Sequence, residues 1–266
     1  MSWQSALSYA KGIAEKHGLT GDAKQQDVDL PLGARIGGVL QLQKAPFIRA
    51  ISNGSFIEMP TDVHSVIKAI SRVNLNLTGS LYRYYLATGD ENEKEVFLQV
   101  YVNEQGYVTE AIYCTQLTRL IPETEEDQKI YMGLSGCGLG DKSYSLWRDQ
   151  LEELGFGEAD LHAAFGEYLE IEYHRDSGDP ELDFVKPFVG SETRLDDAKG
   201  ERGLKQDVYF MPYRREISDW DIKGNVEYLL ITTELVQSKN GDTSKREIHV
   251  DFMVGIPVDV ERVLIQ

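Results

Sequence analysis

One segment of the chain, residues 94–114 (KEVFLQVYVNEQGYVTEAIYC), restricts most strongly what the protein can fold into. In its first half, apolar side chains alternate with others at a period of two, as they do when a β-strand points successive side chains to opposite faces. One face carries Val96, Leu98, Val100 and Val102. Polar residues 103–106 end in Gly106, which can adopt the positive φ of a tight turn, and residues 107–114 return along the first strand. The segment therefore predicts a β-hairpin.

A short motif of this hairpin recurs twice along the chain. It combines Glu, a bulky residue, Leu and a β-branched residue, and it appears as EVFLQV at 95–100, EYLEIE at 167–172 and EYLLIT at 227–232. A glycine-containing turn follows each copy, and strand-like segments at 81–87 and 207–215 precede the first and third copies. We therefore expect two similar three-stranded meanders. Internal duplication stays open, because any protein rich in hairpins produces short matches of this kind.

Weaker patterns predict the remaining elements. Residues 63–77 satisfy helix and strand periods in part, and Leu75 and Leu77 favour a strand in the second half. The acidic residues after Pro122 suit the first turn of a helix, where the helix dipole favours negative charge. The other expected features are a turn and a strand in 30–42, a hairpin formed by 47–51 and 55–58, short helices at 145–154 and 159–165, and exposed loops at 176–183 and 191–203.

The N-terminal segment predicts an amphipathic helix that is separated from the rest of the chain. Its apolar face carries Trp3, Ala6, Leu7, Ala10, Ile13 and Ala14. Gly18 ends the pattern, and the polar residues 20–29 predict a linker or loop. Such a helix can dock on its own domain, on a sister subunit, on another protein or on a membrane, which is least favoured because the polar face is not strongly basic. The residues expected to make the contact are Trp3, Leu7, Ala10, Ile13 and Ala14.

The fold class follows from the balance of these patterns. Strand patterns joined by short polar turns outnumber helical ones, and the alternation of strands and helices typical of parallel folds is missing. The sequence therefore predicts an α+β fold of mainly antiparallel β-sheet meanders, with the N-terminal amphipathic helix and a few short helices. We expect a helix and linker in residues 1–29 and a β-rich domain in residues 30–266, which the repeated motif divides further into subdomains 30–125 and 126–266.

The charge and cysteine content of the chain limit its partners and its location. Its 44 acidic and 27 basic side chains give a formal net charge of −17, so phosphate backbones and anionic membrane surfaces repel it. We expect no nucleic-acid partner, whereas a basic protein segment or a polyamine suits an acidic surface. Only two cysteines are present, and no window has the ~18 apolar residues of a membrane span. With no secretory leader pattern, these features predict a cytoplasmic protein without a built-in anchor.

Two loops imitate ligand-binding motifs without meeting their requirements. Residues 133–143 (GLSGCGLGDKS) are rich in glycine, but Asp141 interrupts the register that a phosphate-binding loop needs. Residues 219–230 begin like a calcium-binding loop, but Lys223 and Leu230 occupy positions that require oxygen ligands. We therefore predict neither nucleotide nor calcium binding, and no cofactor.

Three residues remain as candidates for a chemical role. His249 and Asp251 lie two residues apart in an alternating strand pattern and point to the same face, where a His and a carboxylate can support general base chemistry. Solvent-facing neighbours produce the same pattern. Cys137 lies among glycines and would be reactive only beside a base or a positive potential. The other histidines lack the spacing of zinc ligands: His17, His64, His162 and His174.

The order of several segments resembles that of a bacterial protein family. These segments are EVFLQVYVNEQGYV, RLIPETEEDQKIYMG, LSGCGLGD, MPYRRE, EYLLITTEL and HVDFMVGIPV. They are similar to the YjfK-like bacterial domain of unknown function over about residues 32–256. The resemblance implies no catalytic residue, because no activity is established for that family. Its members are often encoded beside phage-shock-like membrane-associated coiled-coil proteins and enzymes similar to glutathionylspermidine synthase, which implies an accessory role in envelope stress.

The lack of a catalytic motif and the separated N-terminal helix favour a non-catalytic interaction or adaptor protein. It would hold a protein partner through that helix or through an exposed sheet edge. Two alternatives stay open. One is an enzyme whose site is assembled from dispersed residues such as His249, Asp251 and Cys137, and the other is a protein that binds a cationic small molecule on its acidic surface. A homo-oligomer also stays open.

Overall fold

The computed structural model describes residues 29–60, 64–88, 94–197, 205–217, 226–236 and 247–266. In these residues the chain forms a sheet of twelve strands and four short α-helices. The strands are β1 (Val39–Gln41), β2 (His64–Leu75), β3 (Ser80–Leu86), β4 (Val96–Val102), β5 (Val108–Leu120), β6 (Ser143–Trp147), β7 (Glu170–Arg175), β8 (Phe188–Arg194), β9 (Lys205–Glu216), β10 (Val226–Val236), β11 (Glu247–Pro257) and β12 (Leu264–Ile265). The helices are α2 (Ala45–Ser52), α3 (Glu125–Tyr131), α4 (Arg148–Glu153) and α5 (Glu158–Phe165), and 3-10 turns occur at η1 (Pro31–Gly33), η2 (Leu195–Asp197) and η4 (Val260–Arg262).

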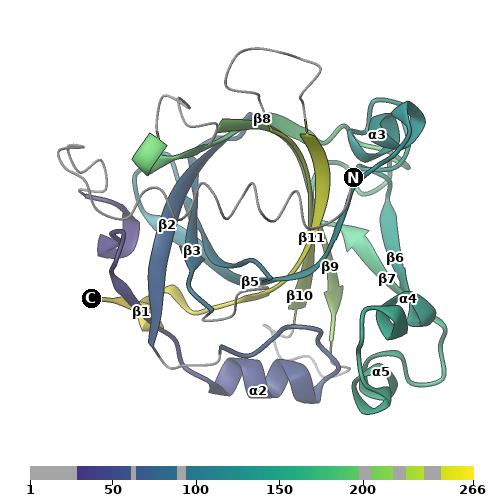
Figure 1. The fold of residues 1–266 in the computed structure, drawn as a ribbon, viewed down its shortest axis with the longest axis horizontal. Coiled ribbons are helices and arrows are strands. Elements are labelled where there is room, and N and C mark those ends of the chain that lie inside the picture. The colour runs from purple at the N-terminus through teal and green to yellow at the C-terminus, as the bar shows by residue number, and fades with distance from the viewer. Residues whose placement is uncertain (1–28, 61–63, 89–93, 198–204, 218–225, 237–246) are drawn as a thin grey trace.

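Eight of the strands close into an antiparallel β-barrel, which Figure 1 shows in a view along the barrel axis. Around the wall the order is β2, β3, β4, β5, β11, β10, β9 and β8, and β8 pairs with β2 to complete the ring. The closing pairs join distant parts of the chain, because Ser71 lies opposite Arg194 and Cys114 lies opposite Gly255. The other strands extend the sheet outside the ring, with β7 and β6 beside β9, and β1 and β12 beside β2.

The predicted α+β fold of separate meanders is wrong. The hairpin at residues 94–114 is present as β4 and β5, and both groups of three strands exist, as β3–β4–β5 and β9–β10–β11. However, β5 pairs with β11, and β8 joins β9 to β2. An isolated meander leaves unpaired backbone N–H and C=O groups along both edges, and closure into one barrel pairs them. Sequence periodicity predicts the faces of a strand but not its neighbours.

Both faces are buried over much of the barrel wall. The outward face contributes to the main hydrophobic core, which lies between the wall and the elements around it. For example, the ring of Phe47 in α2 packs edge-on against Tyr113 of β5, with the ring centroids 4.9 Å apart. The inward face contributes a smaller apolar cluster: Phe97, Ile112, Cys114, Phe210, Leu230 and Met253. The main core therefore surrounds the barrel, and a separate, smaller apolar cluster lies inside the barrel.

Three local predictions are wrong in part. Residues 47–58 form no hairpin, because helix α2, with a proline in its first turn, buries an apolar face against the barrel. The predicted loop 191–203 begins as the end of strand β8, where Glu192 is buried. The predicted helix 145–154 begins as strand β6 and becomes helix α4 only at Arg148.

Other local predictions are confirmed. The second half of segment 63–77 is a strand, as part of β2. Helix α3 begins with three acidic residues, and Thr124 caps it by accepting a hydrogen bond from the backbone N–H of Asp127. Helix α5 covers the whole of the predicted helix 159–165 and begins one residue earlier.

Some predictions concern residues outside the described part of the chain. They include the start of the calcium-like loop, residues 219–224, and almost all of the N-terminal helix and linker, with the expected contact residues Trp3, Leu7, Ala10, Ile13 and Ala14. Among the helices that are described, none is both long enough and apolar enough to cross a membrane.

Candidate functional site

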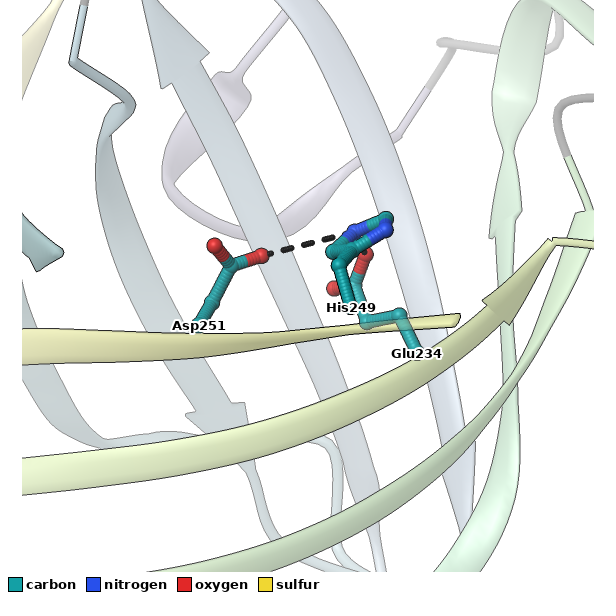
Figure 2. Close-up of side chains that lie close together, drawn as sticks. All are labelled: Glu234, His249 and Asp251. Atoms are coloured by element: carbon teal, nitrogen blue, oxygen red, sulfur yellow. Dashed lines mark hydrogen bonds and ion pairs between the residues drawn. The ribbon is translucent and has the colours of Figure 1, made fainter. Parts of the chain in front are cut away.

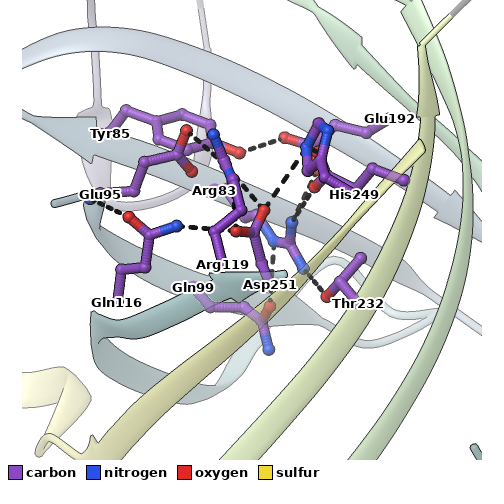
Figure 3. A network of polar contacts seen from close by, with 11 residues as sticks. Arg83, Tyr85, Glu95, Gln99, Gln116, Arg119, Glu192, Thr232, His249 and Asp251 are labelled. Carbon is purple, nitrogen blue, oxygen red and sulfur yellow. Dashed lines mark hydrogen bonds and ion pairs between the residues drawn. The ribbon is translucent and has the colours of Figure 1, made fainter. Parts of the chain in front are cut away.

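Arg83 places a positive charge inside the barrel. It belongs to β3, and β3 and β10 lie on opposite sides of the ring, four strands apart in either direction. The guanidinium nevertheless donates to Thr232 Oγ1 on β10 at 3.2 Å and lies 3.6 Å from Glu234 Oε1 on the same strand. The side chain therefore crosses the interior, as Figure 3 shows. The strand positions that share its face point inward as well.

Glu192 of β8 is the closest acidic partner of Arg83. Its Oε2 accepts a hydrogen bond from Nη1 of Arg83 at 2.8 Å, and its Oε1 accepts from the Tyr85 hydroxyl at 2.5 Å. The ring centroid of Phe97 lies 4.9 Å from the guanidinium carbon. Burial raises the pKa of Glu192, although the charge of Arg83 opposes this effect. These contacts form a buried ion pair with no room for a ligand between the charges.

Three further side chains converge beside this ion pair (Figure 2). Nε2 of His249 lies 2.8 Å from Glu234 Oε2 and 3.6 Å from Asp251 Oδ2. The register of β10 and β11 places Glu234 directly opposite His249, and strand alternation puts Asp251 on the same face. Burial lowers the pKa of His249, but the hydrogen bond and charge of Glu234 outweigh burial and raise it. Glu234, His249 and Asp251 are called the interior triad below.

Arg119 and Gln116 of β5 fix the carboxylate of Asp251 (Figure 3). Nε and Nη2 of Arg119 donate to the two oxygens of Asp251 at 2.6 and 2.8 Å, which is a bidentate ion pair. Nε2 of Gln116 donates to Oδ1 of Asp251 at 2.7 Å. Nη2 of Arg119 also donates to Glu95 at 3.2 Å. The orientation of Asp251 is therefore set by β5 as well as by its own strand.

The interior triad lies near the end of the barrel where β3, β5 and β10 end and β4 and β11 begin. The carboxylates of Glu234 and Asp251 are buried, whereas the His249 side chain is 17% exposed. Glu95 and Arg119 beside it are also only partly buried. Solvent therefore reaches the triad from the side of His249.

The structure brings together two of the three residues that the sequence offered for chemistry. His249 and Asp251 share a face, point inward and meet at 3.6 Å. Cys137 is exposed in the loop between α3 and β6, outside the barrel wall, so it does not join them. The alternative of an enzyme site built from all three residues therefore does not hold for its cysteine.

The other polar residues of the interior were missed in the sequence. Arg83 interrupts the apolar run SLYRYYL of β3, and a charge at an inward position of such a strand is the signal that was available. Glu234 and Arg119 lie near strand ends, where charged residues usually face solvent. Glu192 lay in a segment predicted to be a loop. Only closure of the barrel places these four charges near one another.

The glycine-rich segment 133–143 has a packing role. Gly138 and Gly140 have φ angles of +87° and +117°, and a Cβ atom on either would collide with neighbouring backbone. The backbone N–H of Gly140 donates to the Tyr213 hydroxyl at 2.9 Å, and Arg175 donates to the Gly140 carbonyl at 2.6 Å. These contacts attach the loop to the outer face of the barrel, and they account for its glycines without a phosphate.

Another buried carboxylate, Glu227, lies on the outer face of β10. One oxygen accepts from the Ser55 hydroxyl and, at 2.7 Å, from the backbone N–H of Phe56. The other accepts from the Tyr173 hydroxyl at 2.6 Å and from Arg215 Nε at 2.8 Å. All of its acceptor capacity is used by the protein, so we assign Glu227 to holding the segment after α2 against the barrel.

A pocket at the opposite end of the barrel, beside the turn between β2 and β3, has a volume of about 70 Å³. It is lined by Asn74, Leu77, Gly79 and Tyr101 among others, and it contains no carboxylate, histidine or cysteine. A pocket of this size holds only a few water molecules. It does not suit the organic ligands that larger barrels enclose.

Comparison of the sequence with known protein families identifies the family of the chain. The family described as proteins of unknown function (DUF2491) matches residues 18–263. The chain belongs to this family. All residues of the interior triad lie in the part of this DUF2491 protein that matches. No curated protein and no solved structure matches the chain.

Proposed function

We propose that this DUF2491 protein is a non-catalytic interaction protein that binds an extended segment of a protein partner along strand β6. One observation carries the proposal: β6 ends the strand order of the sheet, so one of its edges has no neighbouring strand in the described part of the chain. An extended segment can add to such an edge by backbone hydrogen bonds. The next three features support this type of partner.

The backbone of β6 has the alternation that strand addition requires. The N–H of Arg148 donates to the carbonyl of Leu169 at 2.9 Å, and Leu146 pairs with Ile171 two residues earlier. Because hydrogen-bonding direction alternates along an antiparallel strand, the N–H and C=O groups of Ser143 and Ser145 point away from β7. These groups are available to a further strand.

Exposed apolar side chains lie at the end of this edge. Tyr168 is 77% exposed, Leu169 is 69% exposed and Trp147 is 45% exposed. Trp147 pairs with Glu170, so all three lie at the same end of the β6–β7 strand pair. Aromatic side chains with accessible polar tips are enriched in protein interfaces. This surface offers apolar contacts to a segment that lies on β6.

The same region is strongly acidic. Residues 143–172 contain eight Asp or Glu residues and one Arg, a net charge of −7 out of −17 for the whole chain. Complementary charge speeds association and selects partners. The proposed partner is therefore an extended segment in which Lys or Arg alternates with apolar residues.

Selection from a displayed library of random linear peptides, with the full chain as target, tests the proposal. We expect enrichment of peptides that alternate basic and apolar residues, with binding that weakens as salt increases. Ser145→Pro removes an outward N–H without breaking the β6–β7 ladder, so it should abolish peptide binding. Ser145→Thr keeps that N–H and is the matched control.

Two results would refute the binding mode. One is equal affinity of the selected peptides for the Ser145→Pro and Ser145→Thr variants, both shown by circular dichroism to be folded. The other is a selection that yields no peptides or only acidic ones. Either result would remove β6 as the binding edge.

Several predictions from the sequence stay predictions beside this proposal. They are the YjfK-like kinship, the role in envelope stress, the cytoplasmic location, homo-oligomerisation, and the N-terminal helix as a second contact surface. Deletion of residues 2–18 in the same peptide-binding assay separates that helix from β6, because a β6-based interaction should survive the deletion.

A further inference from the structure

We propose that the interior triad binds one divalent transition-metal ion, with Glu234, His249 and Asp251 each supplying one ligand atom. An imidazole nitrogen with two carboxylate oxygens is a donor set that Zn²⁺ accepts. The three ligand atoms all lie within 4.8 Å of one another. The proposal does not depend on the interaction at β6.

The distances suit an ion in place of the proton between the side chains. Metal–ligand bonds of about 2.1 Å at angles between 90° and 110° separate two ligand atoms by about 3.0 to 3.4 Å. Nε2 of His249 lies 2.8 Å from Glu234 and 3.6 Å from Asp251, on either side of this interval. Shifts of a few tenths of an ångström therefore bring each carboxylate to a coordination distance from Nε2, and the two carboxylate oxygens, which lie within 4.8 Å of each other, close on the same ion. A fourth position is left for water on the exposed side of His249.

The charge around the triad favours a cation. Within the described interior, four carboxylates (Glu95, Glu192, Glu234 and Asp251) face two guanidinium groups (Arg83 and Arg119). With neutral His249 the cluster has a formal charge of −2, which one divalent ion cancels. Burial makes uncompensated charge costly, so this balance is a driving force for uptake of the ion.

The groups around Asp251 hold its carboxylate in place, as a metal-binding side chain requires. Arg119 and Gln116 donate to Asp251, as outer partners of metal-binding carboxylates do. A carboxylate oxygen has two lone pairs, so Oδ2 of Asp251 can accept from Arg119 and still bind an ion. The ion therefore need not displace either partner.

Titration of untagged, full-length protein with Zn²⁺, after removal of metal by a chelator and in competition with a chromophoric chelator, tests the proposal. We expect one strong site per chain and a higher melting temperature with Zn²⁺. Glu234→Gln and His249→Gln should each weaken binding at least about tenfold. The control is His174→Gln, because among the described residues His174 belongs to no group of three possible metal ligands and only forms an exposed pair with Glu172 at 3.8 Å, so its loss should leave affinity unchanged.

X-ray absorption of the Zn²⁺-loaded wild-type protein gives a test that needs no variant to fold. The spectrum should show one imidazole among oxygen ligands and no sulfur. Sulfur ligation, coordination without imidazole, or no strong site would overturn the proposal, and so would undiminished affinity in a folded Glu234→Gln variant. The Ser145→Pro variant should keep its Zn²⁺ affinity, so failure at β6 and failure at the triad are distinguishable.

Discussion

Replacing Glu227 with alanine should destabilise the protein by about 3–5 kcal/mol, which is the usual cost of removing one partner from a buried ion pair. Arg215 would lose its only carboxylate partner among the described residues, and its side chain is buried against the rings of Phe56 and Tyr173. Burial lowers the pKa of Arg215, but the charge of Glu227 outweighs burial and raises it. Without Glu227, burial is no longer opposed by that charge, but the pKa of an arginine is so high to begin with that the guanidinium stays charged at neutral pH in the variant.

The hydrogen-bond donors that would lose Glu227 as their acceptor support the same range of destabilisation. The backbone N–H of Phe56 cannot rotate to another acceptor, and a buried unpaired donor costs about 1–3 kcal/mol. The hydroxyl groups of Ser55 and Tyr173 can turn, so they add less. Because the ion pair and the donors share one carboxylate, their costs do not add in full, and the total should stay near 3–5 kcal/mol.

Urea denaturation, followed by tryptophan fluorescence and circular dichroism, measures this loss as a lower midpoint at an unchanged slope. Glu170→Ala, at an exposed position of the neighbouring strand β7, is the control and should change stability by no more than about 0.5 kcal/mol. The double variant Glu227→Leu with Arg215→Met removes both charges. Its loss should be smaller than the sum of the two single losses by about 1–3 kcal/mol.

Two outcomes would refute this reasoning. A loss below 1 kcal/mol in Glu227→Ala would mean that water or another group replaces the carboxylate, so the clamp does not hold the segment after α2. Additive losses in the double-variant cycle would mean that Glu227 and Arg215 stabilise the protein independently, against the contact at 2.7 Å.

Two further predictions concern thiols and glycines. Burial raises the pKa of the Cys114 thiol, so a thiol reagent should modify exposed Cys137 quickly and Cys114 only on unfolding; two equally fast thiols in the native protein would contradict this. Alanine at Gly106 should cost about 1 kcal/mol for its positive φ alone. Alanine at Gly140 should lower the free energy of unfolding by more, because its Cβ would also collide with the carbonyl of Val185. Equal losses for the two variants in urea denaturation would contradict this, because they would mean that the loop moves and relieves the collision.

The sequence predicted strands better than their arrangement. Alternation at residues 96–102 identified β4, because each face of a strand has its own environment even when both faces are buried. Periodicity contains no information about partners, so the pairing of β5 with β11 was not predicted. Strand β8 was missed for a different reason: its residues 190–194 (GSETR) contain no apolar side chain that could alternate, and Gly190 is needed where the backbone of Asn74 approaches closely.

The candidate site was predictable only where its residues are neighbours in sequence. His249 and Asp251 were found together because two residues of one strand share a face. Glu234 lies beside them because of the register between β10 and β11, and a short sequence motif does not specify that register. Arg83 reaches the same cluster from the opposite side of the barrel, so only the closed ring predicts it.

Closure of the ring also has a consequence for the order of events during synthesis. The pairs Ser71 with Arg194 and Cys114 with Gly255 span 123 and 141 residues. Contacts between such distant segments slow folding, because a long loop must be ordered before they form. Strand β5 is synthesised more than a hundred residues before its partner β11, so the edge of an early β3–β4–β5 sheet stays uncovered until residues 247–257 have been made. An unpaired edge of this kind invites association with other chains, which makes the nascent protein a candidate for chaperone protection.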